Sequence, residues 1–254
     1  MTRRNAKTPM RAPLVALFLA ALGGAVTDSA IARGSVASGA APAGTLAARA
    51  ASTTVAPPTQ RAEFGDAHPS RIAREVADWA LASADPSGLP FLIVDKPAAT
   101  LYVFDANGRL VGFSPVLLGL ARGDDSVPGI GTRPMAQIRP DERTTPAGRF
   151  LAERGVNSHG EDVVWVDYDA AVSMHRVRAT NPKERRLERL RTPTIDDNRI
   201  SYGCINVPAR FYDRSVVPAF SNGHAVVYVL PETRPVQEQF GFGVASARTP
   251  SKGS

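Results

Sequence analysis

Residues 91–118 read FLIVDKPAATLYVFDANGRLVGFSPVLL, and this stretch decides the fold class. Residues 91–95 and 100–104 are rich in β-branched and aromatic side chains, which favour strands. The Asn-Gly pair at 107–108 is a strong signal for a tight hairpin turn. Residues 109–118 then supply the return strand. The stretch therefore predicts that strands joined by a hairpin open the ordered domain.

Further runs with strand composition follow at short and even spacing, with Gly and Pro between them: residues 149–152, 163–166, 171–175, 200–207 and 225–230. Many short strands without long helices between them are typical of sandwiches and barrels. We therefore expect a mainly β domain over residues 89–231, a β-sandwich or barrel with a few short helices. A domain of about 140 residues is of usual size.

An amphipathic helix is expected before this domain, in a segment that covers residues 66–88. Ser70 is a suitable N-cap for a helix over residues 71–83. Apolar residues recur on one face of it at helical spacing: Ile72, Val76, Trp79 and Ala80. A helix with one apolar face buries that face, so we expect it to pack against another part of the protein.

Residues 1–32 have the pattern of a secretory signal peptide. A basic start is followed by residues 14–26, which carry no charge, and by Ala30-Ile31-Ala32, a small-x-small cleavage site. The apolar run is shorter than the about 20 residues that a membrane-spanning helix needs. A cleaved signal is therefore favoured over a retained anchor. The mature protein is expected in the periplasm or cell envelope, without a stable membrane span.

The charge of the chain does not indicate a nucleic-acid partner. The whole chain has a net charge of +6. Residues 1–32 hold four basic residues and one acidic residue, so their removal lowers the net charge to +3. A modest positive charge is weak support for binding to an anionic polymer.

Residues 33–65 and 232–254 flank the expected domain. The first segment is rich in Ala, Gly, Ser, Thr and Pro, so it can bury little surface to offset the entropy of ordering. We expect it to be a flexible tether. The second segment has Phe240 and Phe242 as its few large apolar residues. We expect a C-terminal tail that lies on the surface or is disordered.

Cys204 is the only cysteine of the chain, and a glycine precedes it. In an oxidising compartment a lone thiol pairs with another chain, lies buried, or is kept for its chemistry. Gly203 permits a tight turn that presents the next side chain and directs main-chain N–H groups to one point. Two main interpretations are therefore open, a catalytic nucleophile and a buried small hydrophobe.

Four stretches in sequence order resemble the catalytic domain of L,D-transpeptidases of the YkuD type, cysteine enzymes that cross-link or remodel peptidoglycan. They are IVDK running into LYVF at residues 93–104, TPAGRF at 145–150, MH at 174–175 and SYGCIN at 201–206. The resemblance covers about residues 90–230. It implies the L,D-transpeptidase catalytic fold and a cysteine acyltransferase with Cys204 as nucleophile and His175 as base.

The sequence departs from the family pattern at two positions beside these residues. Tyr202 stands where the family usually has histidine, and Arg176 follows His175 where Gly or Ser is common. Neither departure removes the nucleophile or its base.

Residues 178–199 form an insertion relative to the family pattern, within the connection from His175 to Cys204. Asn181 as N-cap, followed by Pro182, predicts a short helix there. The segment holds seven basic and four acidic residues, a local net charge of +3. It is either a basic lid beside the site or a solvated charged connector.

Catalysis by Cys204 needs a base, because free cysteine has a pKa near 8.5 and is mostly protonated at neutral pH. His175 ends a predicted strand, which fixes a side chain better than a loop does, so it is the expected base. By resemblance, the main-chain carbonyl of Arg176 orients its imidazole. His159 is the second candidate, but its polar loop favours an exposed histidine without a catalytic role.

The bend at Cys204 supplies candidates for the rest of the site. The main-chain N–H groups of Tyr202, Gly203 and Cys204 are expected to hold the oxyanion formed during acyl transfer. The Tyr202 side chain either adds its hydroxyl or forms a wall. Asn206 and Ser201 are expected to bind the substrate, and a structural hydrogen bond is the alternative for each.

The sequence predicts no metal site and no cofactor. The histidines and the cysteine lack the short spacing of zinc ligands, and the pairs Asp124-Asp125 and Asp196-Asp197 are interpreted as turn residues or solvated charges. No glycine-rich phosphate loop follows a predicted strand.

The resemblance also implies a substrate and partners. The acyl donor would be a tetrapeptide stem of peptidoglycan, cleaved after its diamino acid. The acceptor would be the amine of another stem, a free D-amino acid, or water in a carboxypeptidase or amidase. Carbapenem-type inhibitors would acylate Cys204, and we expect a monomer. The competing class is a catalytically silent wall-binding module in which Cys204 is buried. A third possibility is a secreted toxin, but no feature of this sequence indicates one.

Overall fold

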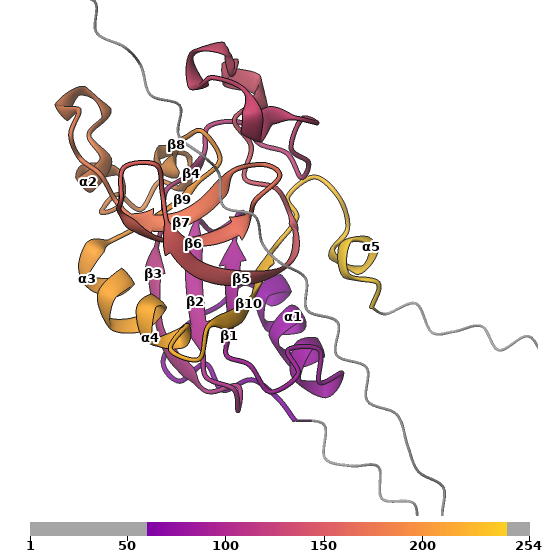
Figure 1. Cartoon of the computed structure of the whole chain (residues 1–254). Helices are drawn as coiled ribbons and strands as arrows, with labels where there is room; N and C mark the ends of the chain where they lie inside the picture. Colours follow the sequence, from indigo (N-terminus) through magenta and orange to yellow (C-terminus); the bar gives the residue numbers. More distant parts are fainter. Residues whose placement is uncertain (1–59, 243–254) are drawn as a thin grey trace, which may run out of the picture. The chain divides into compact units, whose positions relative to one another are not determined.

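The computed structural model describes residues 60–242. The predicted signal peptide and most of the predicted tether lie outside these residues. The described part is mainly β, with short helices around the strands (Figure 1). The strands are β1 (Phe91–Asp95), β2 (Thr100–Phe104), β3 (Leu110–Pro115), β4 (Leu118–Gly119), β5 (Gly148–Val156), β6 (Asp162–Asp167), β7 (Val172–Arg176), β8 (Arg199–Ser201), β9 (Ile205–Val207) and β10 (His224–Val229). The α-helices are α1 (Arg71–Ala82), α2 (Arg186–Arg189), α3 (Ala209–Phe211), α4 (Val217–Ala219) and α5 (Val236–Phe240).

One eight-stranded sheet dominates the fold, in the order β3-β2-β1-β10-β5-β6-β7-β9. β1 pairs in parallel with β10, and β7 with β9, whereas the other neighbours are antiparallel. The two ends of the sheet meet just after β3, where Leu117 and Asn206 exchange main-chain hydrogen bonds of 2.9 and 2.8 Å. This contact nearly closes the sheet. The predicted mainly β, barrel-like architecture is therefore confirmed.

The first two predicted strands coincide with β1 and β2. The single strand predicted over residues 200–207 is wrong. The chain bends at residues 202–204, so β8 pairs with β4 in a small second sheet while β9 ends the large one. A glycine with a positive φ angle at position 203 interrupts the extended run.

The strands β1, β2 and β10 are buried on both faces, which explains their continuous apolar runs. On one face Leu92 and Val227 join a core with the helical segment from α3 to α4. On the other face Phe91 and Tyr228 join a second core with α1 (Figure 1). The large sheet is thus held between two sets of short helices at its centre.

The predicted amphipathic helix is confirmed as α1. Ser70 caps it, because its Oγ accepts the Ala73 N–H at 3.0 Å. The buried residues of α1 are Ala73, Val76, Ala77 and Ala80. Trp79 is partly buried and meets the Tyr228 ring edge to face at 6.0 Å. None of the helices in residues 60–242 is long and apolar enough to cross a membrane.

Both ends of the described chain are more ordered than the composition of the flanking segments predicts. Ala62 and Phe64, which we expected in the tether, are buried in the same core as α1. In the expected tail, Phe240 and Phe242 lie against Trp79, with ring centroids 6.1 and 5.1 Å away. These few aromatic side chains add enough apolar area to dock their segments.

The insertion contains the predicted cap but not one continuous helix. Asn181 Oδ1 accepts the Lys183 N–H at 3.1 Å and begins a 3₁₀ turn over Pro182–Glu184. Arg185 then adopts a left-handed conformation with φ of 52°, and α2 follows it. Residues other than glycine rarely take this conformation. The insertion therefore holds two short turns joined at Arg185 and a third, a 3₁₀ turn over Ile195–Asn198.

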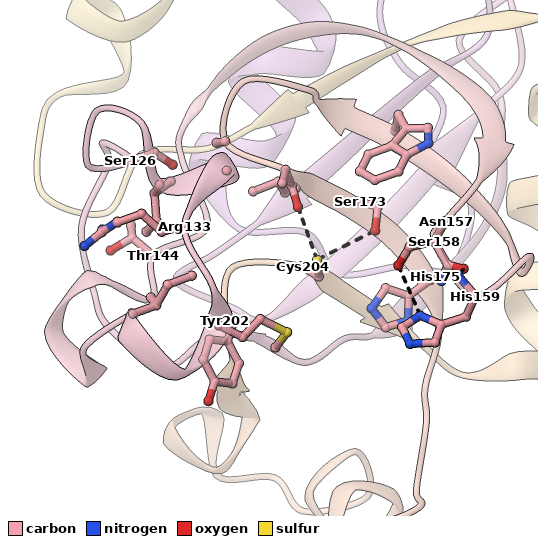
Figure 2. Close-up of a pocket in the computed structure, with 18 of the residues that line it drawn as sticks. Ser126, Arg133, Thr144, Asn157, Ser158, His159, Ser173, His175, Tyr202 and Cys204 are labelled. Carbon is pink, nitrogen blue, oxygen red and sulfur yellow. Dashed lines mark hydrogen bonds between the residues drawn. The ribbon is translucent and has the colours of Figure 1, made fainter. Parts of the chain in front are cut away.

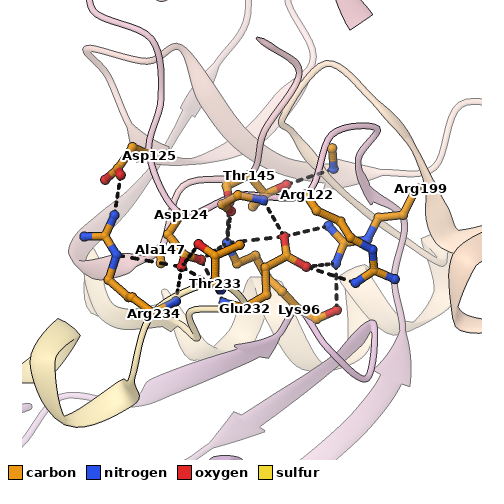
Figure 3. A network of polar contacts seen from close by, with 12 residues as sticks. Lys96, Arg122, Asp124, Asp125, Thr145, Ala147, Arg199, Glu232, Thr233 and Arg234 are labelled. Atoms are coloured by element: carbon orange, nitrogen blue, oxygen red, sulfur yellow. Dashed lines mark hydrogen bonds and ion pairs between the residues drawn. The ribbon is translucent and has the colours of Figure 1, made fainter. Parts of the chain in front are cut away.

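A buried ion cluster connects the end of β1 with four later parts of the chain (Figure 3). Lys96, with no exposed surface, donates to Asp124 at 2.9 Å and to the Thr145 carbonyl at 2.9 Å. Arg199 donates to Glu232 at 2.5 Å. Asp124 also accepts the N–H of Glu232 at 2.8 Å. The interpretation of Asp124 as a solvated loop charge is therefore wrong, because partners remote in sequence bury it.

Candidate active site

Cys204 lies at a bend, and only glycine fits at position 203 before it. Gly203 has φ of 129°, and a Cβ atom there would come within 2.8 Å of the Thr144 carbonyl oxygen. The same peptide is fixed from the other side, because the Thr145 hydroxyl donates to the Gly203 carbonyl at 2.7 Å. The bend presents a half-buried thiol at its tip.

Parallel pairing of β7 and β9 brings His175 to this bend. In the register of the two strands His175 stands opposite Asn206, two residues after Cys204. The His175 Nδ1 atom lies 2.8 Å from the Arg176 carbonyl oxygen. A carbonyl can only accept, so Nδ1 carries the proton and Nε2 is left as the basic nitrogen. The Arg176 side chain points elsewhere and pairs with Asp213.

The thiol of Cys204 has an environment that favours its ionised form. Burial raises the pKa of the thiol, but hydrogen bonding to His175, the charge of His175 and contacts to Ser173 outweigh burial, so the pKa lies below its ordinary value. The sulfur lies 3.6 Å from the Ser173 hydroxyl and 3.8 Å from the Ala171 carbonyl oxygen (Figure 2). A lowered thiol pKa is what a cysteine nucleophile requires.

One of the three predicted oxyanion donors is already engaged. The Gly203 N–H donates to the Ser201 hydroxyl at 3.1 Å. Within residues 60–242 the N–H groups of Tyr202 and Cys204 make no such bond. These two remain as main-chain donors at the bend, so the predicted role of Gly203 reduces to its backbone conformation.

Ser201 and Asn206 both bind the main chain of the nucleophile. The Ser201 hydroxyl donates to the Cys204 carbonyl at 2.6 Å, and Asn206 Nδ2 donates to the same oxygen at 3.1 Å. Both residues are buried. The structural hydrogen bonds are observed, and both residues also line a cavity beside Cys204, so their substrate-binding role stays a prediction. Their side chains position Cys204.

Tyr202 forms a wall beside the thiol. Its hydroxyl points away from Cys204 (Figure 2). The Arg143 guanidinium lies over the Tyr202 ring, 3.8 Å from its centroid. Arg143 also donates to the Ile138 carbonyl at 3.2 Å. The ring is thus stacked against the segment that precedes Thr144, and of the two alternatives for Tyr202 the wall is the one observed.

Cys204, His175 and Tyr202 line two neighbouring cavities. The first, of about 330 Å³, is bounded partly by apolar side chains such as those of Ile138 and Trp165. The second, of about 390 Å³, is bounded by the insertion. The thiol of Cys204 is therefore reached from two cavities.

His159 also lines the first cavity, on the exposed loop between β5 and β6 (Figure 2). Its Nδ1 lies 3.4 Å from the Ser158 hydroxyl. No hydrogen bond joins it to Cys204 within the described residues. His159 thus lies on an exposed loop, as the sequence predicts. The assignment of His175 as the base stays a prediction.

Two arginines of the predicted basic lid reach the site, and Arg178 lines both cavities beside Cys204. Arg186 Nη1 donates to Asn206 Oδ1 at 2.5 Å, and its Nε pairs with Glu184. Arg185 instead pairs with Glu188 on the surface. Arg189 donates to main-chain carbonyls within the insertion. Arg178 and Arg186 therefore bring the charge of the insertion to the cavities beside Cys204, and Arg186 is the one bonded to Asn206.

Sequence patterns did not single out two residues that contact the site, namely Ser173 and Arg143. Ser173 stands in a β-rich run, where a serine carries no signal of its own. Arg143 reaches the site from a segment that is remote in sequence. Within residues 60–242 no group of three or more His, Cys, Asp or Glu side chains could hold a metal ion.

Comparison with known proteins gives similarity in structure only. No family model and no curated protein matches the sequence. Solved structures that match include the helical cell shape determining protein Pgp2 from Campylobacter jejuni, with 13% identity over 57% of this chain and 49% of that chain, and a TM-score of 0.39.

Two further matches are L,D-transpeptidases. The enzyme from Xylanimonas cellulosilytica has 14% identity over 56% of this chain and 60% of that chain, with a TM-score of 0.33. LdtMt1, in complex with imipenem, has 17% identity over 56% and 58%, with a TM-score of 0.32. The chain thus spans about half the length of these three structures. At these identities and TM-scores no residue role is transferred from them.

Proposed function

We propose that this protein is an exported cysteine acyltransferase that acts on stem peptides of peptidoglycan. The proposal rests chiefly on one observation. Cys204 and His175 line the same cavities, and the Nδ1–H of His175 is bound to the Arg176 carbonyl, so that Nε2 is available as a base. The substrate class comes from the four sequence stretches that resemble L,D-transpeptidases.

The reaction would begin with transfer of the thiol proton from Cys204 to His175 Nε2. The thiolate attacks the carbonyl carbon of the stem peptide, and the N–H groups of Tyr202 and Cys204 are the candidate donors to the oxyanion. Collapse of this intermediate breaks the C–N bond. The leaving amine takes the proton from the imidazolium, and a thioester on Cys204 remains.

A second substrate would then complete the cycle. An amine that enters the site loses its proton to His175 and attacks the thioester, which forms a new amide and restores the thiol. Water in the same place would give a carboxypeptidase or amidase. The two cavities beside Cys204 leave room for a donor and an acceptor to approach from different sides.

Intact-protein mass spectrometry with a tetrapeptide muropeptide tests the proposal. We expect an acyl adduct on the wild-type protein and none on Cys204→Ala, which should melt at nearly the same temperature because the thiol is half-buried. A cross-linked product indicates transfer, and a shortened stem indicates hydrolysis. If neither the muropeptide nor a carbapenem gives an adduct, the protein is a silent wall-binding module instead.

A further inference from the structure

A serine hydroxyl faces the sulfur of Cys204 from the same strand that holds His175. Ser173 and His175 are two residues apart in β7, so their side chains lie on the same face of the sheet. Ser173 is 6% exposed, and its Oγ lies 3.6 Å from the Cys204 sulfur (Figure 2). Within residues 60–242 the thiol is the only hydrogen-bond partner of this hydroxyl. The geometry thus gives the Ser173 hydroxyl one partner, the reacting atom.

We propose that Ser173 is a third catalytic residue of this site and that its hydroxyl donates a hydrogen bond to the Cys204 thiolate. A neutral thiol can donate to the Ala171 carbonyl oxygen, 3.8 Å away. A thiolate has no proton and can only accept, so that carbonyl cannot stabilise it. The Ser173 hydroxyl can, because it rotates to donate. This inference takes from the proposed function only the identity of the reacting atom.

The protons and electrons of the step balance without Ser173 losing its proton. The thiol proton passes to His175 Nε2, and the Ser173 O–H then points at the negative sulfur. As the sulfur uses its electron pair to bond the acyl carbon, it becomes a neutral thioester and a poor acceptor. The hydroxyl therefore stabilises the free nucleophile and not the acyl-enzyme.

Two features of the surroundings support this role. The hydroxyl is buried in the wall of the first cavity, so water competes little for it. The main-chain N–H and the hydroxyl of Ser173 both lower the pKa of the thiol against the effect of burial, alongside His175. The contrasting explanation is that a small residue is needed only to leave space for the sulfur, and alanine would meet that need.

The pH–rate profile of alkylation by iodoacetamide separates these explanations. Cys204 is the only cysteine, so alkylation of the chain reports on it alone. The acidic limb is the part of the profile in which the rate rises with pH as the thiol ionises. In Ser173→Ala we expect this limb to lie about one pH unit higher, which is about a tenfold loss of thiolate below the pKa. The alkaline plateau should stay level or rise, because a thiolate of higher pKa is intrinsically more nucleophilic.

Ser114→Ala is the matched control, since Ser114 is a buried strand serine whose hydroxyl donates to the Pro115 carbonyl. Its profile should equal that of the wild type. A wild-type acidic limb in Ser173→Ala would overturn the proposal, and so would an equal displacement in the control.

A second pair of variants covers the case in which Ser173→Ala does not fold. Thr and Val differ in the hydroxyl and both suit a strand. The acidic limb of Ser173→Thr should lie at the same pH as that of the wild type. The acidic limb of Ser173→Val should lie at higher pH. Equal profiles would overturn the proposal. Because iodoacetamide replaces the cell-wall substrate, a displaced limb without muropeptide turnover refutes only the proposed function, and turnover without a displaced limb refutes only the role of Ser173.

Discussion

The Thr145 hydroxyl donates a 2.7 Å hydrogen bond to the Gly203 carbonyl oxygen across a sequence separation of 58 residues. The same oxygen atom of Thr145 accepts the Gly119 N–H at 2.9 Å. The Thr145 carbonyl accepts from Lys96 in the buried ion cluster. One threonine thus joins the ion cluster to the peptide bond that precedes the nucleophile.

Replacement of Thr145 by valine keeps the shape of the side chain but leaves the Gly203 carbonyl and the Gly119 N–H without their partner. Leaving a buried polar group unpaired costs about 1–3 kcal/mol. We expect Thr145→Val to unfold at lower denaturant concentration than the wild type and to react more slowly at Cys204, whereas Thr145→Ser should behave as the wild type. Equal stability of the valine and serine variants would contradict this.

The base assignment is tested by alkylation of Cys204 at neutral pH. His175 lowers the pKa of the thiol, so the thiolate of the wild type persists to lower pH than that of a free cysteine, whose pKa is about 8.5. We expect His175→Ala to move the acidic limb of the rate profile to higher pH. His159→Ala should leave it in place. If His159 is the sensitive residue, the assignment is wrong.

The basic insertion is tested by a pair of arginine variants. Arg186 donates to Asn206 beside the nucleophile, whereas Arg185 only pairs with Glu188 on the surface. We expect Arg186→Glu to raise the apparent KM for anionic stem peptides and to flatten its dependence on salt, because charge steering weakens as the Debye length shrinks. Arg185→Glu is the control of equal charge change. Equal kinetics of both variants at low salt would indicate that the insertion is only a solvated connector.

Acid stability is expected to depend on Asp124. Burial raises the pKa of this carboxyl, but hydrogen bonds from Thr233, Lys96 and main-chain N–H groups outweigh burial and hold the pKa well below its usual range. A lowered pKa in the folded state adds stability above the ordinary value of about 3.9, and this stability is lost as pH falls below it.

Loss of one partner of a buried ion pair costs about 3–5 kcal/mol. We therefore expect Asp124→Asn to be destabilised strongly near neutral pH. In thermal melts at several pH values its deficit should shrink as the solution becomes acidic. Asp125→Asn, at a more exposed carboxylate beside it, serves as the control. A deficit that does not change with pH would contradict the role of the Asp124 charge.

Local sequence was informative where an element depends on its own residues. The runs at 91–95 and 100–104 became strands because apolar β-branched and aromatic residues fill both faces of a covered sheet. The Ser70 cap and the Asn181 cap depend on a side chain and an N–H a few residues away. Such features need no knowledge of the rest of the chain.

The features that sequence reasoning missed depend on remote partners. The turn at Gly203 was expected, but not that it divides residues 200–207 between two sheets or that the Gly203 N–H is engaged by Ser201. Asp124 is buried because the segment at Glu232 returns to it, 108 residues later. Ser173 gains its partner only when β7 and β9 pair in parallel. The roles predicted for Cys204 and His175 stay predictions that the experiments above address.

The place of β10 has a consequence for the order in which the protein can fold. β10 is the last strand of residues 60–242, yet it lies at the centre of the large sheet between β1 and β5. Until residue 229 has left the ribosome, β1 and β5 each have an unpaired edge. Exposed edges of this kind promote association with other chains. The large sheet can therefore be completed only after β10 has been synthesised, in a late step that pairs it with both strands.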